Sequence, residues 1–172
     1  MALSRRRTDR VPPEVREALD LPRSERALSW AHDDLAGTTV VATTHGLYAV
    51  DRAGERTLAK PWHLVDAGSW SADLFQLTVT WVDGSRPSQW VFREATMLPE
   101  TLRERVQASV VLAQRLDLGD RRSARAVIRQ DLATGELVQQ VVLGRGVRAG
   151  DPGVDEATGA ALAYLREQVG LD

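Results

Sequence analysis

The spacing of apolar residues changes along the chain, from every second residue between positions 26 and 92 to every third or fourth residue after position 99. A period of two is typical of strands with one buried face. The clearest strand covers residues 75–82, where four apolar residues alternate with polar ones. Asp83-Gly84 follows it directly and gives the strongest hairpin signal in the chain.

Five further strands are predicted in the same half of the chain from alternating or β-branched residues. They cover residues 26–32, 38–43, 47–50, 56–67 and 89–92. We expect an interruption near Pro61, because proline cannot donate to a ladder, and a Gly-Ser turn just before Trp70. His45-Gly46 is expected to form a tight turn, since glycine and histidine accept positive φ more readily than most residues.

A longer helix is predicted for residues 99–115, with Pro99 in its first turn. Its apolar residues recur at spacings of three and four, which is typical of a helix with one buried face. This stripe consists of Leu102, Val106, Val110, Ala113 and Leu116. A short helix is also predicted near the start, at residues 13–19, beginning at Pro13 and ended by Pro22.

The C-terminal third returns to strands. Residues 125–132 and 136–143 are predicted to form a hairpin around Ala133-Thr134-Gly135, and the glycine-rich residues 144–153 a loop. A final helix is predicted for residues 155–169, with Asp155 as its N-cap and Gly170 just past its end.

The pattern therefore predicts an α+β protein. We expect a small antiparallel β-barrel or sandwich capped by an amphipathic helix, with a C-terminal β-hairpin and helix. A small bent sheet leaves one end of its core open, which such a helix can cover. We divide the chain into a disordered arm (residues 1–11), the barrel with its capping helix (12–118), and an extension packed on the same unit (119–172).

Three segments resemble motifs of bacterial pleckstrin-homology-like (PH-like) domains. Residues 39–50 resemble the Val-Val-x-Thr-x-x-x-Leu hairpin of that family, here Val40 to Leu47. Residues 60–65, Lys-Pro-Trp-His-Leu-Val, look like its proline-tryptophan strand start, and residues 77–84 resemble the hairpin that follows. The resemblance covers roughly residues 24–116 and excludes the tail from residue 121.

The resemblance implies binding of phosphoinositides, peptides or partner proteins, and rarely catalysis. Lipid-binding members carry clustered lysine and arginine in the first loop between strands. The corresponding residues here, 33–37, are Asp-Asp-Leu-Ala-Gly, so phosphoinositide binding is not expected.

Composition narrows the options further. The chain has 172 residues, 43% of them apolar and 27% charged, and a net charge of −2, which is ordinary for a globular domain without a global basic field. The absence of cysteine excludes disulfides and thiolate chemistry and indicates a reducing cytoplasm. Lys60 is the only lysine beside many arginines, which indicates a GC-rich bacterial genome. No stretch approaches 18 apolar residues, so no membrane span is predicted.

No motif with catalytic or metal-binding spacing stands out. His32, His45 and His63 match no metal signature, and no Gly-x-Ser-x-Gly elbow is present. The glycines of residues 144–150 lack the dinucleotide spacing. We therefore assign no catalytic, cofactor-binding or metal residue, and expect no cofactor.

An interaction surface is the remaining candidate site. Exposed tryptophan beside arginine makes a good interface anchor, and grouped arginines can contact phosphate. The candidates are Arg5, Arg6, Arg7, Trp70, Trp90, Arg121, Arg122, Arg145 and Arg148. Trp62 and Trp81 are instead expected in the core.

Three functions follow in order of preference. The first is a non-enzymatic interaction or scaffold protein that binds a protein partner or itself, as a homodimer. The second is a nucleic-acid-associated accessory protein that uses the arginine groups. The third is a small-molecule sensor or enzyme with a pocket at the mouth of the barrel.

Overall fold

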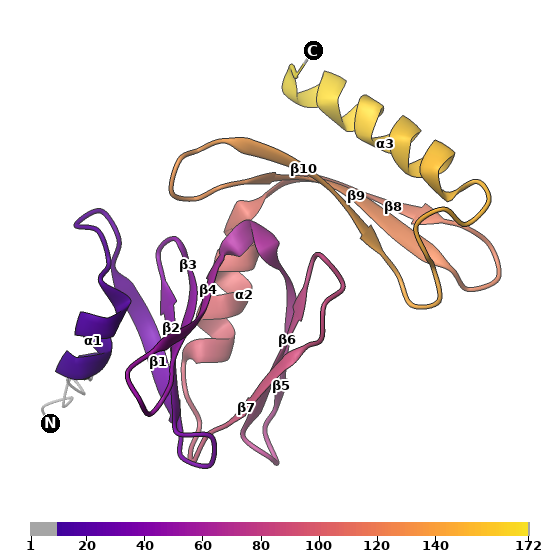
Figure 1. Ribbon diagram of the computed structural model, residues 1–172. Helices are drawn as coiled ribbons and strands as arrows, with labels where there is room; N and C mark the ends of the chain where they lie inside the picture. Colours follow the sequence, from indigo (N-terminus) through magenta and orange to yellow (C-terminus); the bar gives the residue numbers. More distant parts are fainter. Residues whose placement is uncertain (1–9, 172) are drawn as a thin grey trace, which may run out of the picture.

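The computed structural model describes residues 10–171, which contain three antiparallel sheets and three α-helices (Figure 1). These residues form no closed barrel, because each sheet keeps its own two edges. The architecture is thus α+β, as predicted. The candidates Arg5, Arg6 and Arg7, and most of the predicted arm, lie outside the described residues.

The first sheet contains four strands in sequence order, joined by tight turns. They are β1 (Ala27–Asp33), β2 (Thr38–Thr43), β3 (Gly46–Val50) and β4 (Arg56–Pro61). Helix α1 (Pro13–Leu19) covers the outer face of this sheet, where Val15 and Leu19 pack against Val41 and Val50. The helix ends at Asp20, which adopts a left-handed conformation with φ of 45°.

The second sheet contains three strands in sequence order. They are β5 (Val65–Ser71), β6 (Gln76–Trp81) and β7 (Ser88–Val91). A single turn of 3-10 helix, η1 (Trp62–Leu64), interrupts the chain after Pro61, as predicted, and leads from the first sheet into the second. The expected turn before Trp70 was wrong, since Gly68 and Ser69 pair with β6 inside β5.

One hydrophobic core is shared by the first two sheets and by helix α2 (Leu98–Ser109). Val40 and Leu47 come from the first sheet, Leu77 and Val79 from the second, and all four are almost fully buried. The fully buried Trp62 lies between them, and its indole donates a hydrogen bond to the Thr43 carbonyl at 2.9 Å. The α2 residues Leu98 and Leu102 belong to this core, and Figure 1 shows α2 beside the first two sheets.

The predicted helix over residues 99–115 was wrong at its C-terminal end. The helix ends at Ser109, and β8 (Val110–Asp117) follows without a loop. The stripe residues Val110, Ala113 and Leu116 therefore lie in a strand. Residues 110–112 are Val-Val-Leu, which fit a strand well, and pairing along the whole length of β9 decides the outcome.

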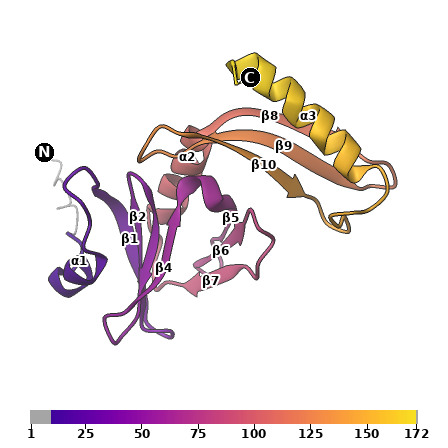
Figure 2. The same cartoon turned by 45° about the horizontal axis from the view of Figure 1, so that its top comes forward.

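The third sheet contains β8, β9 (Ser123–Gln130) and β10 (Leu137–Leu143), in the order β10-β9-β8. The predicted C-terminal hairpin is thus confirmed and gains a third strand. Helix α3 (Val154–Val169) lies on the face of this sheet that points away from the first seven strands (Figures 1 and 2). There Ala161 and Leu165 pack against Ala126 and Ile128.

The ends of α3 only partly match the expectation. Gly170 does end the helix in a left-handed conformation with φ of 70°. Asp155 is not the N-cap: the cap position is Gly153, with φ of 78° and no side-chain hydrogen bond. No helix among residues 10–171 has the length and apolar character needed to cross a membrane.

Candidate functional site

Strand β1 is an edge of the first sheet, and no described strand pairs with its outer side. Its inner side pairs with β2, with an irregularity between Ala27 and Ser29 and regular pairing from Ser29 to Asp33. An edge strand presents a row of backbone N–H and C=O groups that can pair with another chain. β1 is therefore an edge strand whose pairing with β2 is regular over five residues.

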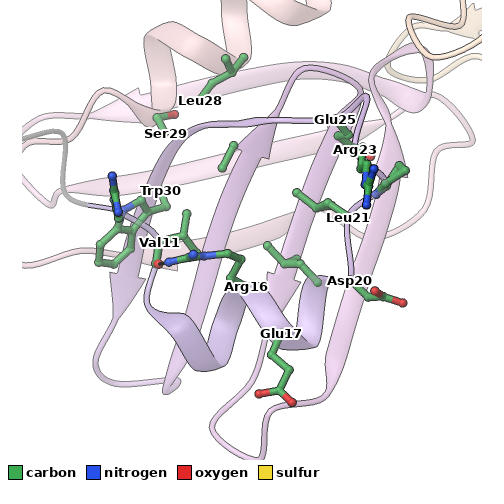
Figure 3. A pocket seen from close by; sticks show the side chains of 14 residues that line it. Val11, Arg16, Glu17, Asp20, Leu21, Arg23, Glu25, Leu28, Ser29 and Trp30 are labelled. Atoms are coloured by element: carbon green, nitrogen blue, oxygen red, sulfur yellow. Dashed lines mark hydrogen bonds between the residues drawn. The ribbon is translucent and has the colours of Figure 1, made fainter.

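A groove of about 660 Å³ runs along one side of β1. Helix α1 and the segment that follows it form the opposite wall, which includes Val11 and Leu21, while Trp30 lies on the β1 side (Figure 3). Leu19 also lines the groove. Arg16 supports this wall by donating a hydrogen bond to the Val11 carbonyl at 3.3 Å. Exposed residues of both signs also line the groove, namely Arg10, Glu17, Asp20 and Arg23.

A second groove of about 420 Å³ runs along the other side of β1. Its far wall is the segment of residues 92–97, which connects β7 to α2. Phe92 is buried there, while Met97 is 66% exposed. An ion pair between Arg93 and Asp34 closes one end. Leu28, Ser29 and Trp30 line both grooves, so the two grooves flank the same stretch of edge.

The two edges of the first sheet differ in character. β4 carries Arg56, Lys60 and Pro61, and charges and proline are the usual means by which an edge is protected from pairing. Between Ala27 and His32, β1 contains no Asp, Glu, Lys, Arg or proline. The buried Ser29 hydroxyl also makes no hydrogen bond within residues 10–171.

Asp33 anchors the end of β1. Its carboxylate accepts hydrogen bonds from the backbone N–H groups of Leu35 and Ala36, both at 3.0 Å, and from that of Val91 at 3.0 Å. This side chain therefore shapes the turn to β2 and ties the first sheet to β7. The acidic segment of residues 33–37 was the reason why phosphoinositide binding was not expected. One of its residues, Asp33, thus has a structural role.

The candidate tryptophans are not free anchors. Trp90 is only 7% exposed and belongs to the shared core. Trp70 is half-buried and stacks on Phe92, with ring centroids 6.3 Å apart and planes 20° from parallel. Both side chains mainly serve packing.

The structure brings the C-terminal candidate arginines to one end of the third sheet. Arg121 and Arg122 lie in the turn from β8 to β9, and Arg145 and Arg148 in the segment after β10. These two segments are neighbours: Arg122 lies 3.9 Å from the Asp151 carboxylate, and the Gly144 N–H donates to the Ser123 carbonyl at 2.8 Å.

The histidines lie in separate places. His32 contacts Thr39, with 2.8 Å between Nδ1 and Oγ1, while His45 Nδ1 lies 3.7 Å from the Glu25 carboxylate. Glu25 also accepts a hydrogen bond from Thr43. Burial, and next to it Glu25, raises the pKa of Tyr48 to about 12. Within residues 10–171, no three His, Asp or Glu side chains gather as a metal ion would need.

Sequence reasoning missed Arg129, which is 3% exposed. Its guanidinium donates to the carbonyls of Trp62, at 2.6 Å, and Val65, at 3.1 Å, and to the Ser109 hydroxyl at 2.9 Å. Burial lowers its pKa to about 10. The available signal was a single charge directly after the apolar run of residues 126–128.

No protein-family model, curated protein or solved structure matches the chain significantly.

Proposed function

We propose that the protein is an interaction module that binds an extended peptide as an additional strand along β1. The observation that carries this proposal is the pair of grooves on the two sides of one edge, which carries no Lys, Arg, Asp, Glu or proline between Ala27 and His32. Successive side chains of a strand point to opposite faces of its sheet. A peptide paired with Ser29–Asp33 would therefore place alternate side chains in the two grooves.

The character of the grooves defines the chemistry of the peptide. Both are lined largely by apolar side chains near β1, including Leu28 and Trp30. We therefore expect apolar side chains at alternate positions of the peptide, while its backbone supplies the hydrogen bonds. This mode of recognition, in which main-chain pairing gives affinity and pockets give specificity, recurs in peptide-binding domains.

A peptide fits the grooves better than a second copy of the chain does. If two β1 strands paired with each other, the side chains that already form the groove walls would face one another. Trp30 packs in its own unit, so the second copy would offer mainly Leu28 as a filler. Grooves of about 660 and 420 Å³ would remain largely unfilled.

We also propose that residues 24–116 are related to PH-like domains. Four antiparallel strands, then three, and then the capping helix α2 support this proposal. Because many functions share one fold, the relationship only makes peptide binding plausible and does not identify the ligand.

The test is a selection of peptides from a phage-displayed library of random 12-residue sequences. We expect enriched peptides with apolar residues at every second position, and amide NMR shifts that change mainly in Ala27–Asp33. A Leu28→Lys variant places a charge on the edge and should weaken binding at least about tenfold, or about 1.4 kcal/mol.

The matched control is Thr57→Lys, which adds the same charge to the opposite edge of the sheet and should bind normally. In an added strand, alternate N–H groups point toward β1. N-methylation of one alternate set in the peptide should therefore abolish binding, and methylation of the other set should not. Equal effects of the two lysine variants, or shift changes away from β1, would refute the proposal.

A further inference from the structure

A polar hollow of about 320 Å³ lies at the end of the third sheet, where β8, β9 and the segment after β10 meet the start of β5. Three arginines line it, Arg115, Arg125 and Arg145, with a single acidic residue, Asp66. Ser123 also lines the hollow, and its hydroxyl makes no hydrogen bond with a described residue.

The positive charges in this hollow are only partly balanced. Arg115 and Arg125 are direct cross-strand partners, and like charges in that position destabilise a sheet. Asp66 forms an ion pair with Arg125. The side chains of Arg115 and Arg145 form no ion pair or hydrogen bond with any residue in 10–171. The repulsion between Arg115 and Arg125 disfavours the fold locally. An anion bound beside the guanidinium groups of Arg115 and Arg145 would relieve it, and this is the arrangement expected of an anion site.

The same excess of positive charge acts on Arg129, which lies four residues after Arg125 in β9. Burial is the main cause that lowers the pKa of Arg129, and Arg125 lowers it further, while Asp66 acts in the opposite direction. One carboxylate thus faces several guanidinium groups along this part of the molecule.

We propose that this hollow binds the phosphate group of a small phosphate monoester through Arg115, Arg125 and Arg145. A phosphate dianion would offset the charge excess, and guanidinium groups hold phosphate oxygens with paired hydrogen bonds. The Ser123 hydroxyl supplies a further donor. The site is separate from the β1 edge, so it does not depend on the peptide proposal.

The surroundings favour one phosphate group over a nucleic-acid backbone. Arginines continue from the hollow to the turn between β8 and β9, but carboxylates accompany them. Asp117 and Asp120 lie in or beside that turn, and Asp151 lies 3.9 Å from Arg122. A long polyanion would meet these carboxylates, whereas a single phosphate in the hollow would not.

Calorimetric titration at low salt with inorganic phosphate and with glycerol 3-phosphate tests the site. We expect both to bind the wild-type chain. Arg115→Gln and Arg145→Gln should each weaken binding about tenfold, the effect of losing one charge-assisted hydrogen bond. The control Arg86→Gln removes the same charge from the exposed turn after β6 and should leave binding unchanged.

Thermal unfolding separates this role from a structural one. Without phosphate, Arg115→Gln should unfold at the same or a higher temperature than the wild type, because a repulsion with Arg125 is lost. Phosphate should raise the unfolding temperature of the wild type more than that of the variant.

Absence of binding by both phosphates, or equal weakening by Arg86→Gln, would overturn the proposal. So would a lower unfolding temperature of Arg115→Gln without phosphate. A 12-nucleotide DNA strand that binds more tightly than glycerol 3-phosphate would show instead that the arginines serve nucleic acid.

Discussion

His63 is a titratable side chain buried where η1 meets the third sheet. It is 9% exposed, and its Nδ1 atom has no hydrogen-bond partner within residues 10–171. Burial is the main cause that lowers its pKa below the ordinary 6.5, and Arg129 lowers it further. Asp131, with an oxygen 4.0 Å from Nδ1, and Glu136 oppose the shift without cancelling it.

This burial predicts a stability that falls in mild acid. The unfolded chain takes up a proton on His63 near pH 6.5, whereas the folded chain does so only at a lower pH. The contribution is therefore fully present above pH 6.5 and is lost as the pH falls through the folded pKa. Urea unfolding between pH 7.5 and 5.5 should show a decline that His63→Gln largely removes.

His32 provides the matched control because it is exposed on β1. The His32→Gln variant should keep the decline of the wild type. If His63→Gln and the wild type lose stability in parallel over this range, His63 is not the group responsible.

At the scale of the element, Gly46 has a specific role where β3 pairs with β4. The expectation of positive φ was wrong, because neither His45 nor Gly46 adopts it. Gly46 is instead the first residue of β3, opposite Pro61 in β4. A Cβ atom there would lie 2.6 Å from the Lys60 carbonyl oxygen, so glycine is required for the close approach of two backbones.

Two glycine substitutions should therefore act in opposite directions. Gly46→Ala should destabilise the protein by about 1–3 kcal/mol, as overpacking against a backbone usually does. Gly159→Ala lies on the exposed side of α3 with nothing within 4 Å of its Cβ, and should stabilise by about 0.5–1 kcal/mol. Urea unfolding measures both, and a stable Gly46→Ala variant would contradict the close-approach argument.

The sequence predicted local elements well where one signal decides the structure. Residues 38–43 and 13–19 were predicted with the observed bounds, from β-branched residues in one case and an initial proline in the other. The prediction failed at residues 110–117, where the apolar spacing fits a helix and the residue types fit a strand. The pairing of these residues with β9, a separate segment of the chain, determines that they form a strand.

The candidate sites depend on contacts between segments that are separate in the sequence, and they were therefore harder to predict. The Arg115–Arg125 pair exists only because residue 115 lies in a strand. The grooves beside β1 exist because α1 and residues 92–97 come to its two sides, and no local pattern encodes that. Arg145 was a candidate from the start, but its partners in the hollow were not predictable.

For the molecule as a whole, Arg129 joins the first two sheets to the third. The single turn η1 and the start of β5 present the carbonyls of Trp62 and Val65, and one guanidinium from β9 donates to both. Gln140 of β10 adds a hydrogen bond to the His63 carbonyl at 2.6 Å, and Arg125 pairs with Asp66. This contact between the first two sheets and the third, which we call the joint, is thus largely polar, unlike the hydrophobic cores on either side of it.

An Arg129→Met variant should loosen this joint. It removes the guanidinium hydrogen bonds to the buried Trp62 and Val65 carbonyls, although the Trp62 carbonyl still accepts from the Val65 N–H. We expect a loss of about 3 kcal/mol in the free energy of unfolding. Arg129→Lys keeps the charge but lacks the planar fork, so it should also destabilise. The exposed Arg86→Met serves as the control and should change stability little.

The tryptophans allow the two parts to be followed separately during this unfolding. All five lie between residues 30 and 90, so tryptophan fluorescence reports mainly the first two sheets and η1, whereas circular dichroism also reports α3. The wild type should show one urea midpoint by both methods, because the joint couples the parts. In Arg129→Met the midpoints should separate, and midpoints that still coincide would mean that the apolar contacts of α2 and β8 suffice to hold the molecule together.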